Sequence, residues 1–139
     1  MTHRISEKLR LAVMNRANSI CEYCLVPEFF LATTFHIDHI RSQKHGGKTT
    51  LDNLAYTCPH CNQNKGSDIA TFIDEETDQL IRFFNPRKDH WHEHFQVNEG
   101  EILPLSPIGQ ATIRILGFNQ TERIILRKML IEINFYPSK

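Results

Sequence analysis

The N-terminal half of the chain alternates between apolar segments at helical or strand spacing and short polar segments. Between residues 6 and 18, apolar side chains recur every three or four positions and Ser6 can cap the first turn, which predicts an amphipathic helix. Residues 29–40 are rich in aromatic and branched side chains and predict a strand. Residues 41–50 are polar and contain a Gly-Gly pair, which indicates a loop, and residues 51–57 predict a second short strand.

The pattern in the second half predicts further helices and strands. Residues 62–73 are polar on one side, as in a short surface helix, and residues 79–85 alternate as in a strand. Residues 95–97 and 101–105 predict a hairpin about an Asn-Glu-Gly turn. We therefore expect small sheets interleaved with helices, which is an α+β fold.

Two helices are predicted at the C-terminal end. Ser106 followed by Pro107 predicts the start of the first, because Ser caps helices and Pro suits the first helical position. Gly117 or Asn119 is expected to end it, and Thr121 to cap the second. The second helix carries an apolar stripe that we expect to face the core, made of Ile124, Ile125, Met129 and Ile133.

Composition indicates one domain over residues 1–139. The chain has 139 residues and a mass of 16.2 kDa, and 40% of its residues are hydrophobic, enough for one core. It has no apolar run long enough to span a membrane and no apolar centre of a secretory signal, so we expect a cytoplasmic protein without a membrane partner. The net charge is +0, so a polyanion must be bound by a local patch.

The cysteines form two Cys-x-x-Cys pairs, Cys21 with Cys24 and Cys58 with Cys61. A tight turn directs both sulfurs of a pair at one point, and four thiolates are the ligand set of a closed structural Zn²⁺ site. Two disulfides are the first alternative, which a reducing cytoplasm disfavours, and a redox pair between a strand and a helix is the second. We predict a structural zinc that leaves no position open for a substrate.

Other polar residues stand between and after the cysteine pairs: Asp38-His39, Asn53 in a leucine-flanked turn, and Asn62 followed by Lys65-Gly66. In order and spacing this segment, about residues 20–70, resembles the HNH endonuclease family. The resemblance implies a ββα-metal (His-Me finger) core held by the four-cysteine zinc site. An N-terminal helix precedes this core, and a C-terminal extension over about residues 74–139 adds the hairpin and two helices.

The resemblance also implies a hydrolytic mechanism. His39 is the expected general base, because imidazole titrates near neutral pH. Asp38 and Asn62 offer hard oxygen ligands to one catalytic divalent cation, Mg²⁺ or Mn²⁺. Asn62 stands where the family can have a third His, which makes this an HNN variant. The family gives Asn53 an orienting role toward the loop and the ring of His39.

Strand geometry limits how these residues meet. Neighbours on a regular strand face opposite sides, so Asp38 and His39 can share one phosphate only where the strand ends or bulges. Alternation puts His36 on the side of Asp38, as a candidate further metal ligand or hydrogen-bonding partner. Several cations flank the expected phosphate and are candidates for contacts with the DNA backbone, namely Arg41, Lys44, His45, Lys48 and Lys65.

These observations predict a metal-dependent HNH endonuclease that hydrolyses DNA, nicks one strand, and leaves 5′-phosphate and 3′-hydroxyl ends. The alternative is a zinc-stapled nucleic-acid-binding module without cleavage. The joint presence of Asp38, His39, Asn53 and Asn62 favours the nuclease. The sequence fits a monomer and a homodimer equally, and it leaves the specificity for DNA open.

Overall fold

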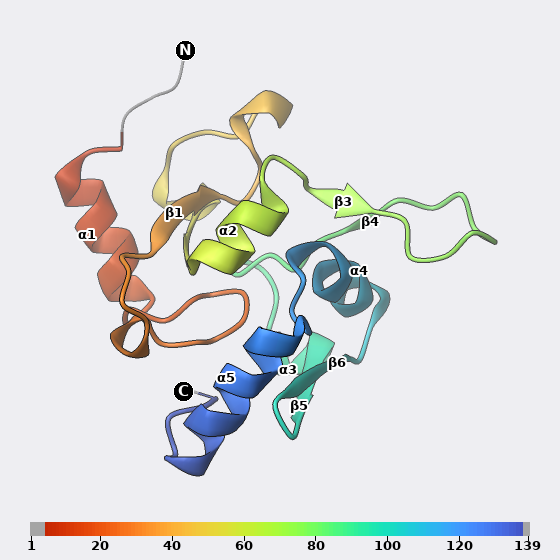
Figure 1. Ribbon diagram of the computed structural model, residues 1–139. Coiled ribbons are helices and arrows are strands. Elements are labelled where there is room, and N and C mark those ends of the chain that lie inside the picture. Colours follow the sequence, from red (N-terminus) through yellow and green to blue (C-terminus); the bar gives the residue numbers. More distant parts are fainter. Residues whose placement is uncertain (1–4, 138–139) are drawn as a thin grey trace.

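The computed structural model describes residues 5–137, and within them the strands form two-stranded antiparallel sheets between helices (Figure 1). This confirms the predicted α+β class. The helices are α1 (Glu7–Arg16), α2 (Pro59–Lys65), α3 (Trp91–His94), α4 (Pro107–Leu116) and α5 (Thr121–Glu132). The strands are β1 (His36–His39), β2 (Leu54–Thr57), β3 (Ala70–Thr71), β4 (Ile81–Arg82), β5 (Phe95–Asn98) and β6 (Glu101–Pro104).

A ββα unit made of β1, β2 and α2 forms the upper part of the molecule in Figure 1. β1 and β2 pair from His36 opposite Thr57 to His39 opposite Leu54. α2 packs against β1 on one side and against α4 on the other. The order strand, loop, strand and helix agrees with the arrangement that the family resemblance implies.

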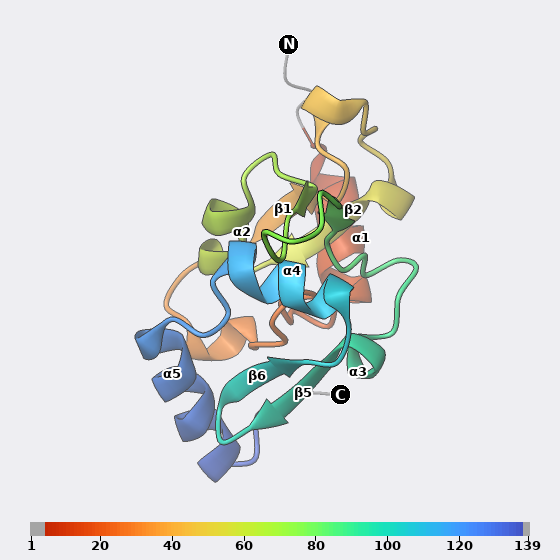
Figure 2. The same cartoon turned by 90° about the vertical axis from the view of Figure 1, so that its right-hand side faces the viewer.

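α4 lies between this unit and the β5–β6 hairpin, as Figure 2 shows. Its start follows the prediction, because the Ser106 hydroxyl accepts a hydrogen bond from the Gly109 N–H at 3.0 Å and Pro107 is the first helical residue. It ends at Gly117, which has the left-handed backbone conformation (φ 63°) that glycine adopts without strain. The β5–β6 hairpin also lies where the alternation predicts it.

Three predicted elements are much shorter or displaced. The strand expected over residues 29–40 is confined to β1, because the Glu28 carboxylate ties the preceding segment down through the Phe35 N–H and the Tyr56 hydroxyl, both at 2.7 Å. The helix expected over residues 62–73 is α2, which begins earlier because the Cys58 sulfur caps it. The strand expected over residues 79–85 is reduced to β4, which pairs with β3.

The face of α5 that meets the core is not the predicted one. Ile125, Met129 and Ile133 are 53%, 59% and 51% exposed, whereas Arg123 and Arg127 are buried. The core beside α5 presents backbone carbonyls and sulfur atoms, which require hydrogen-bond donors. Guanidinium groups supply these donors, and an apolar stripe cannot. The helix itself begins at Thr121, one residue earlier than predicted, because Gln120 and not Thr121 is at the cap position.

One hydrophobic cluster joins the two parts of the chain. It includes Val13 from α1, Tyr56 from β2, Phe95 from β5, and Leu116 and Leu130 from the last two helices. The ββα unit therefore packs on the C-terminal elements without a separate core. In residues 5–137, no helix has the length and apolar character needed to cross a membrane.

Candidate active site and metal centre

Asp38 and His39 lie at the end of β1, just before the loop of residues 41–50. The register is unbroken through Asp38 opposite Ala55, and the Ile40 N–H donates to the Asn53 carbonyl at 2.9 Å. The two side chains consequently face opposite sides of the hairpin. Asp38 is buried, with 6% of its surface exposed, whereas His39 is half-buried. The strand ends immediately after His39.

The Asp38 carboxylate is surrounded by donors. The Lys65 ammonium lies 3.2 Å and 3.0 Å from its two oxygens, and the Tyr23 hydroxyl donates to Oδ2 at 3.1 Å. Burial raises the pKa of Asp38, and the nearby Lys65 and Tyr23 oppose that rise. Lys65 is itself only 2% exposed and also donates to the His39 carbonyl at 2.9 Å. The Asp38 carboxylate thus already has a charged partner, the buried Lys65 ammonium.

The His39 ring is held at its outer nitrogen. Nε2 lies 2.9 Å from the Thr49 hydroxyl, which also accepts from the Gln43 side chain at 3.4 Å. Burial lowers the pKa of His39, Asp38 raises it, and Lys65 lowers it, with a net decrease. A lowered pKa leaves the imidazole neutral at pH 7, and only the neutral ring can accept a proton.

Asn53 closes the loop of residues 41–50. Its Oδ1 accepts from the Arg41 N–H at 2.9 Å, and its Nδ2 donates to the carbonyls of Arg41 at 3.0 Å and Lys48 at 2.8 Å. Gly47 fits beneath this bridge, where an added Cβ would lie 1.7 Å from the Arg41 carbonyl oxygen. The loop that carries Thr49, and through it the ring of His39, is therefore anchored at its two ends.

The other two candidate ligands have fewer contacts. Asn62 lies in the first turn of α2, half-buried, and its backbone N–H donates to the Cys58 carbonyl at 3.0 Å. His36 opens β1 and is exposed. Within residues 5–137, neither side chain forms a hydrogen bond to Asp38.

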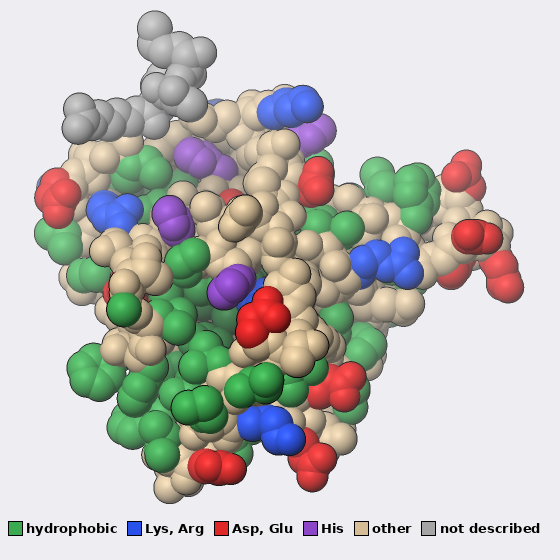
Figure 3. Space-filling model, in the orientation of Figure 1, with side chains coloured by type: hydrophobic (Ala, Val, Ile, Leu, Met, Phe, Trp, Pro, Cys, Tyr) green, Lys and Arg blue, Asp and Glu red, His purple; other side chains and the backbone are tan. Residues whose placement is uncertain are grey.

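The candidate DNA-binding cations fall into two groups. In the loop, Arg41, Lys44, His45 and Lys48 are exposed, whereas Lys65 is buried against Asp38. In Figure 3, the histidines visible on this face lie over the half that contains the ββα unit, and acidic side chains gather at the tip of the β3–β4 arm. The charges that balance the loop cations are therefore located elsewhere on the surface.

The four cysteine sulfurs form one buried cluster. All lie within 4.8 Å of one another, and no disulfide joins them. Cys24 is held by an N–H bond to the Cys21 sulfur at 3.5 Å, and Cys61 by one to the Cys58 sulfur at 3.4 Å. The second pair lies between β2 and α2, which is the position of a redox pair. Its sulfurs, however, are buried together with those of the first pair, which favours a metal site over a redox pair.

This cluster fits a tetrahedral metal ion. Four sulfurs at about 2.3 Å from zinc lie about 3.8 Å from one another, and the sulfurs of Cys24 and Cys58 are 3.7 Å apart. Burial raises the pKa of the Cys21 and Cys61 thiols well above the usual value, so a metal ion must displace their protons when it binds. The site can hold zinc, and no other group of three or more His, Cys, Asp or Glu in the described chain has this proximity.

Arg123 of α5 contacts the cysteine cluster, and this contact was not predicted. Its guanidinium lies 3.0 Å from the Cys61 sulfur and 3.8 Å from the Cys58 sulfur, and it donates to the Leu116 and Gly117 carbonyls at 2.6 Å and 3.0 Å. Burial alone would lower the pKa of Arg123, but the sulfurs outweigh it and raise the pKa. The charge offsets part of the negative charge of a tetrathiolate site.

The C-terminal elements also reach the first cysteine pair. The Tyr136 hydroxyl donates to the Cys24 carbonyl at 2.8 Å, and the Trp91 indole donates to the Tyr23 carbonyl at 2.8 Å. Nothing in the local pattern around these aromatic residues indicates such contacts. The sequence did contain one indication for Arg123. Arg127 lies four residues later, so the two arginines share one face of the helix.

Comparison with known families agrees with this geometry. The family model described as HNH endonuclease matches residues 21–68, which contain the four cysteines, β1, β2 and α2. Comparisons with curated proteins and with solved structures gave no significant match. The matched segment has the ββα order, the cysteine cluster and the Asp-His pair at the end of its first strand. Over residues 21–68, this chain therefore matches the HNH endonuclease family.

Proposed function

We propose that this protein is a metal-dependent endonuclease that hydrolyses phosphodiester bonds of DNA. The observation that supports this most is the position of His39, a neutral imidazole held by Thr49 beside Asp38 in an HNH-family segment. Hydrolysis of a phosphodiester requires a group that removes a proton from the attacking water, and a neutral imidazole has this property. His39 is the general base in this proposal.

The other residues have supporting roles. Asp38 and Asn62 would hold one Mg²⁺ or Mn²⁺, because a carboxylate and a carboxamide are the hard oxygen ligands these ions prefer. When bound, this cation would neutralise charge that develops on the phosphate. Asn53 keeps the loop in place, and Thr49 keeps the imidazole in orientation. A single site of this kind nicks one strand and leaves 5′-phosphate and 3′-hydroxyl ends.

Zinc has a structural role in the same proposal. Cys21, Cys24, Cys58 and Cys61 would hold one Zn²⁺, and a site with four sulfur ligands offers no position to a substrate. A four-cysteine zinc site requires reduced thiols, which fits a location in the reducing cytoplasm. His36 remains a candidate additional ligand or partner of the catalytic cation, from its place on β1.

One observation favours the alternative of a nucleic-acid-binding module without cleavage. Asp38 is buried and already paired with Lys65, so a catalytic cation has to share or displace that partner. A protein in which Lys65 permanently filled this position would keep the fold and its surface cations but would not hydrolyse DNA. The two functions differ in the requirement for a divalent cation.

The decisive experiment is a nicking assay on supercoiled plasmid with the zinc-loaded protein, in Mg²⁺, in Mn²⁺ and without either ion. Wild-type protein is expected to convert the plasmid to the open circle only when the ion is present. His39→Ala should lower the rate by about 10²–10⁴-fold, the usual contribution of a general base. His92→Ala, an exposed histidine on α3, is the matched control and should cleave normally.

Circular dichroism and zinc content must be the same for the three proteins. If His39→Ala cleaves at a near-normal rate, His39 is not the base, and His36 and His45 become the candidates. If wild-type protein binds the plasmid but does not cleave it in either ion, the binding-module alternative is correct.

A further inference from the structure

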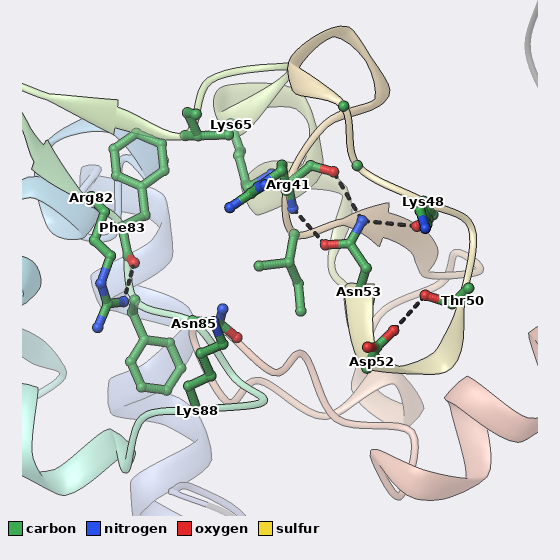
Figure 4. Close-up of a pocket in the computed structure, with 15 residues that line it drawn as sticks. Arg41, Lys48, Thr50, Asp52, Asn53, Lys65, Arg82, Phe83, Asn85 and Lys88 are labelled. Carbon is green, nitrogen blue, oxygen red and sulfur yellow. Dashed lines mark hydrogen bonds between the residues drawn. The ribbon is translucent and has the colours of Figure 1, made fainter.

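A cavity of about 610 Å³ lies beside the end of β1, where the ββα unit faces the segment after β4 (Figure 4). Ile40 and Lys65 line it, and Lys65 is the residue whose ammonium reaches Asp38 and the His39 carbonyl. The cavity therefore shares a wall with the candidate active site. A ligand in it would therefore lie next to the candidate active site, separated from Asp38 by Lys65.

The first wall belongs to the HNH-family segment. Lys48, Thr50, Asp52 and Asn53 lie on one side of the cavity in Figure 4, with Arg41 near its top. The side chains of Arg41 and Lys48 are exposed and form no hydrogen bond or ion pair in the described structure, although their backbone groups bind Asn53. Two cationic side chains are thus free to bind a ligand.

The second wall lies outside the matched segment. Arg82, Phe83, Asn85 and Lys88 stand opposite the first wall in Figure 4. Asp89 holds the Arg82 guanidinium with two bonds of 2.8 Å and 3.0 Å, which leaves other N–H groups of this side chain unused. Lys88 is exposed, and in residues 5–137 its ammonium has no partner.

The charge of the cavity is positive. Asp52 is the one carboxylate among the described residues that line it, and it accepts a hydrogen bond from Thr50. The cavity is also lined by the unpaired cationic side chains of Arg41, Lys48 and Lys88, which outnumber this carboxylate. Cations on two facing walls suit an anionic chain that passes between them, and phosphodiesters are such a chain.

We propose that residues 82–88 form the second wall of a nucleic-acid cleft, in which one strand is held by its phosphates between Arg41 and Lys48 on one side and Lys88 on the other. The inference rests on the proposed function and extends it to a contact surface beyond residues 21–68. A cavity of this volume holds a short run of one strand, and the rest of a bound nucleic acid would lie outside it.

The test measures binding without cleavage. Fluorescence anisotropy is recorded for the full zinc-loaded chain with a labelled single-stranded oligonucleotide of about 20 nucleotides, long enough to fill one binding site, and with the matching duplex, without Mg²⁺ or Mn²⁺. Lys88→Ala should weaken binding to the single strand about two- to fivefold at low salt, as loss of one exposed charge contact does. The slope of log K against log salt should also fall by about one.

Lys88→Glu should weaken binding further, because it places a negative charge beside the phosphate. The matched control is Lys128→Ala, since Lys128 is an exposed lysine of α5 that does not line the cavity. This control should bind as wild type does.

Each outcome decides between the proposals. Unchanged binding by both Lys88 variants, or absence of nucleic-acid binding by wild-type protein, overturns the cleft. A loss seen with the duplex alone overturns the claim that one strand is held. If the Lys88 variants lose binding while the plasmid assay shows no cleavage, the cleft stands and the nuclease function fails. If cleavage is observed and both Lys88 variants bind normally, only the cleft fails.

Discussion

At the scale of single residues, the candidate site depends on side chains that fix backbone groups. Asn53 joins the start of the loop to its end through three hydrogen bonds, to Arg41 twice and to Lys48 once. The loop of residues 41–50 is thus held by one carboxamide. His39 makes its own contact with Thr49 and none with Asn53.

Asn53→Ala should destabilise the protein by about 2 kcal/mol, because it leaves three backbone groups without their partner. The free energy of unfolding in urea measures this loss. Hydrogen exchange of the Arg41 amide should accelerate in the same variant. Lys44→Ala, an exposed substitution in the same loop, should change the stability by less than about 0.5 kcal/mol. Equal stabilities for the two variants would contradict the anchoring role.

Asp89 is a second residue that holds neighbouring groups in place, namely the Arg82 guanidinium and the Asn85 N–H. Its hydrogen bonds with Arg82, and a further one from the Asn85 N–H, lower its pKa. A lowered pKa in the folded state means that the charged form stabilises the fold above the ordinary pKa of Asp, and that this contribution disappears as the pH falls through the lowered pKa. Arg82 is 51% exposed, so solvent screening keeps the contribution small.

Asp89→Asn should therefore lower the free energy of unfolding by about 0.5–1 kcal/mol at pH 7. The difference from wild type should shrink as the pH falls below the usual range of aspartate. Urea denaturation at a series of pH values measures this difference. A constant difference across the acidic range would show that the charge of Asp89 has no part in it.

At the scale of elements, α5 buries charge and exposes apolar side chains. Arg123 approaches the Cys61 sulfur although 62 residues separate them, and Arg127 donates to the Gly100 and Phe118 carbonyls at 2.6 Å. The helix is thus attached through guanidinium groups whose partners belong to the cysteine cluster and to nearby turns. α5 is therefore attached to the cysteine cluster as well as to the core.

Arg123→Met should accelerate transfer of zinc to a chromophoric chelator and lower the stability by about 3 kcal/mol, because carbonyls and sulfurs lose a buried charged donor. Lys128→Met, on the exposed face of the same helix, is the control and should retain zinc as wild type does. Zinc release at the wild-type rate from a folded Arg123→Met protein would limit Arg123 to a role in packing.

At the scale of the whole molecule, the cysteine cluster connects both halves of the chain. Arg123 and Tyr136 reach it from the C-terminal side, and the Trp91 indole binds the backbone between the first two cysteines. Removal of zinc is therefore expected to disturb elements well beyond residues 21–68. Trp91 is the single tryptophan of the chain, so its fluorescence reports on the C-terminal part and on its contact with the first cysteine pair.

Chelation of zinc, or the substitution Cys58→Ser, should unfold the protein in one transition, since a structural zinc contributes on the order of 10 kcal/mol to folding. Trp91 fluorescence and far-ultraviolet circular dichroism should change together during a titration with chelator. Elemental analysis of the native protein should find about one zinc per chain, as one closed site requires. A metal-free protein with native spectra and full activity would exclude the structural role.

The sequence by itself determined the features that depend on neighbours along the chain. Ser6 and Ser106 cap the helices that follow them, and each Cys-x-x-Cys pair forms its own turn. The order of strand, loop, strand and helix could be predicted for the same reason. Element limits were less accurate where a distant partner intervenes, as Glu28 does for the strand expected over residues 29–40.

Only the tertiary structure decided which distant residues meet. The apolar stripe of α5 predicts burial of Ile125 and Met129, but the carbonyls and sulfurs opposite the helix select Arg123 and Arg127 instead. The same holds for the pairing of Lys65 with Asp38, and for the cationic wall after β4 beside the loop of residues 41–50. Helical spacing shows which residues share a face. The groups that pack against that face come from other parts of the chain, so the spacing does not predict them.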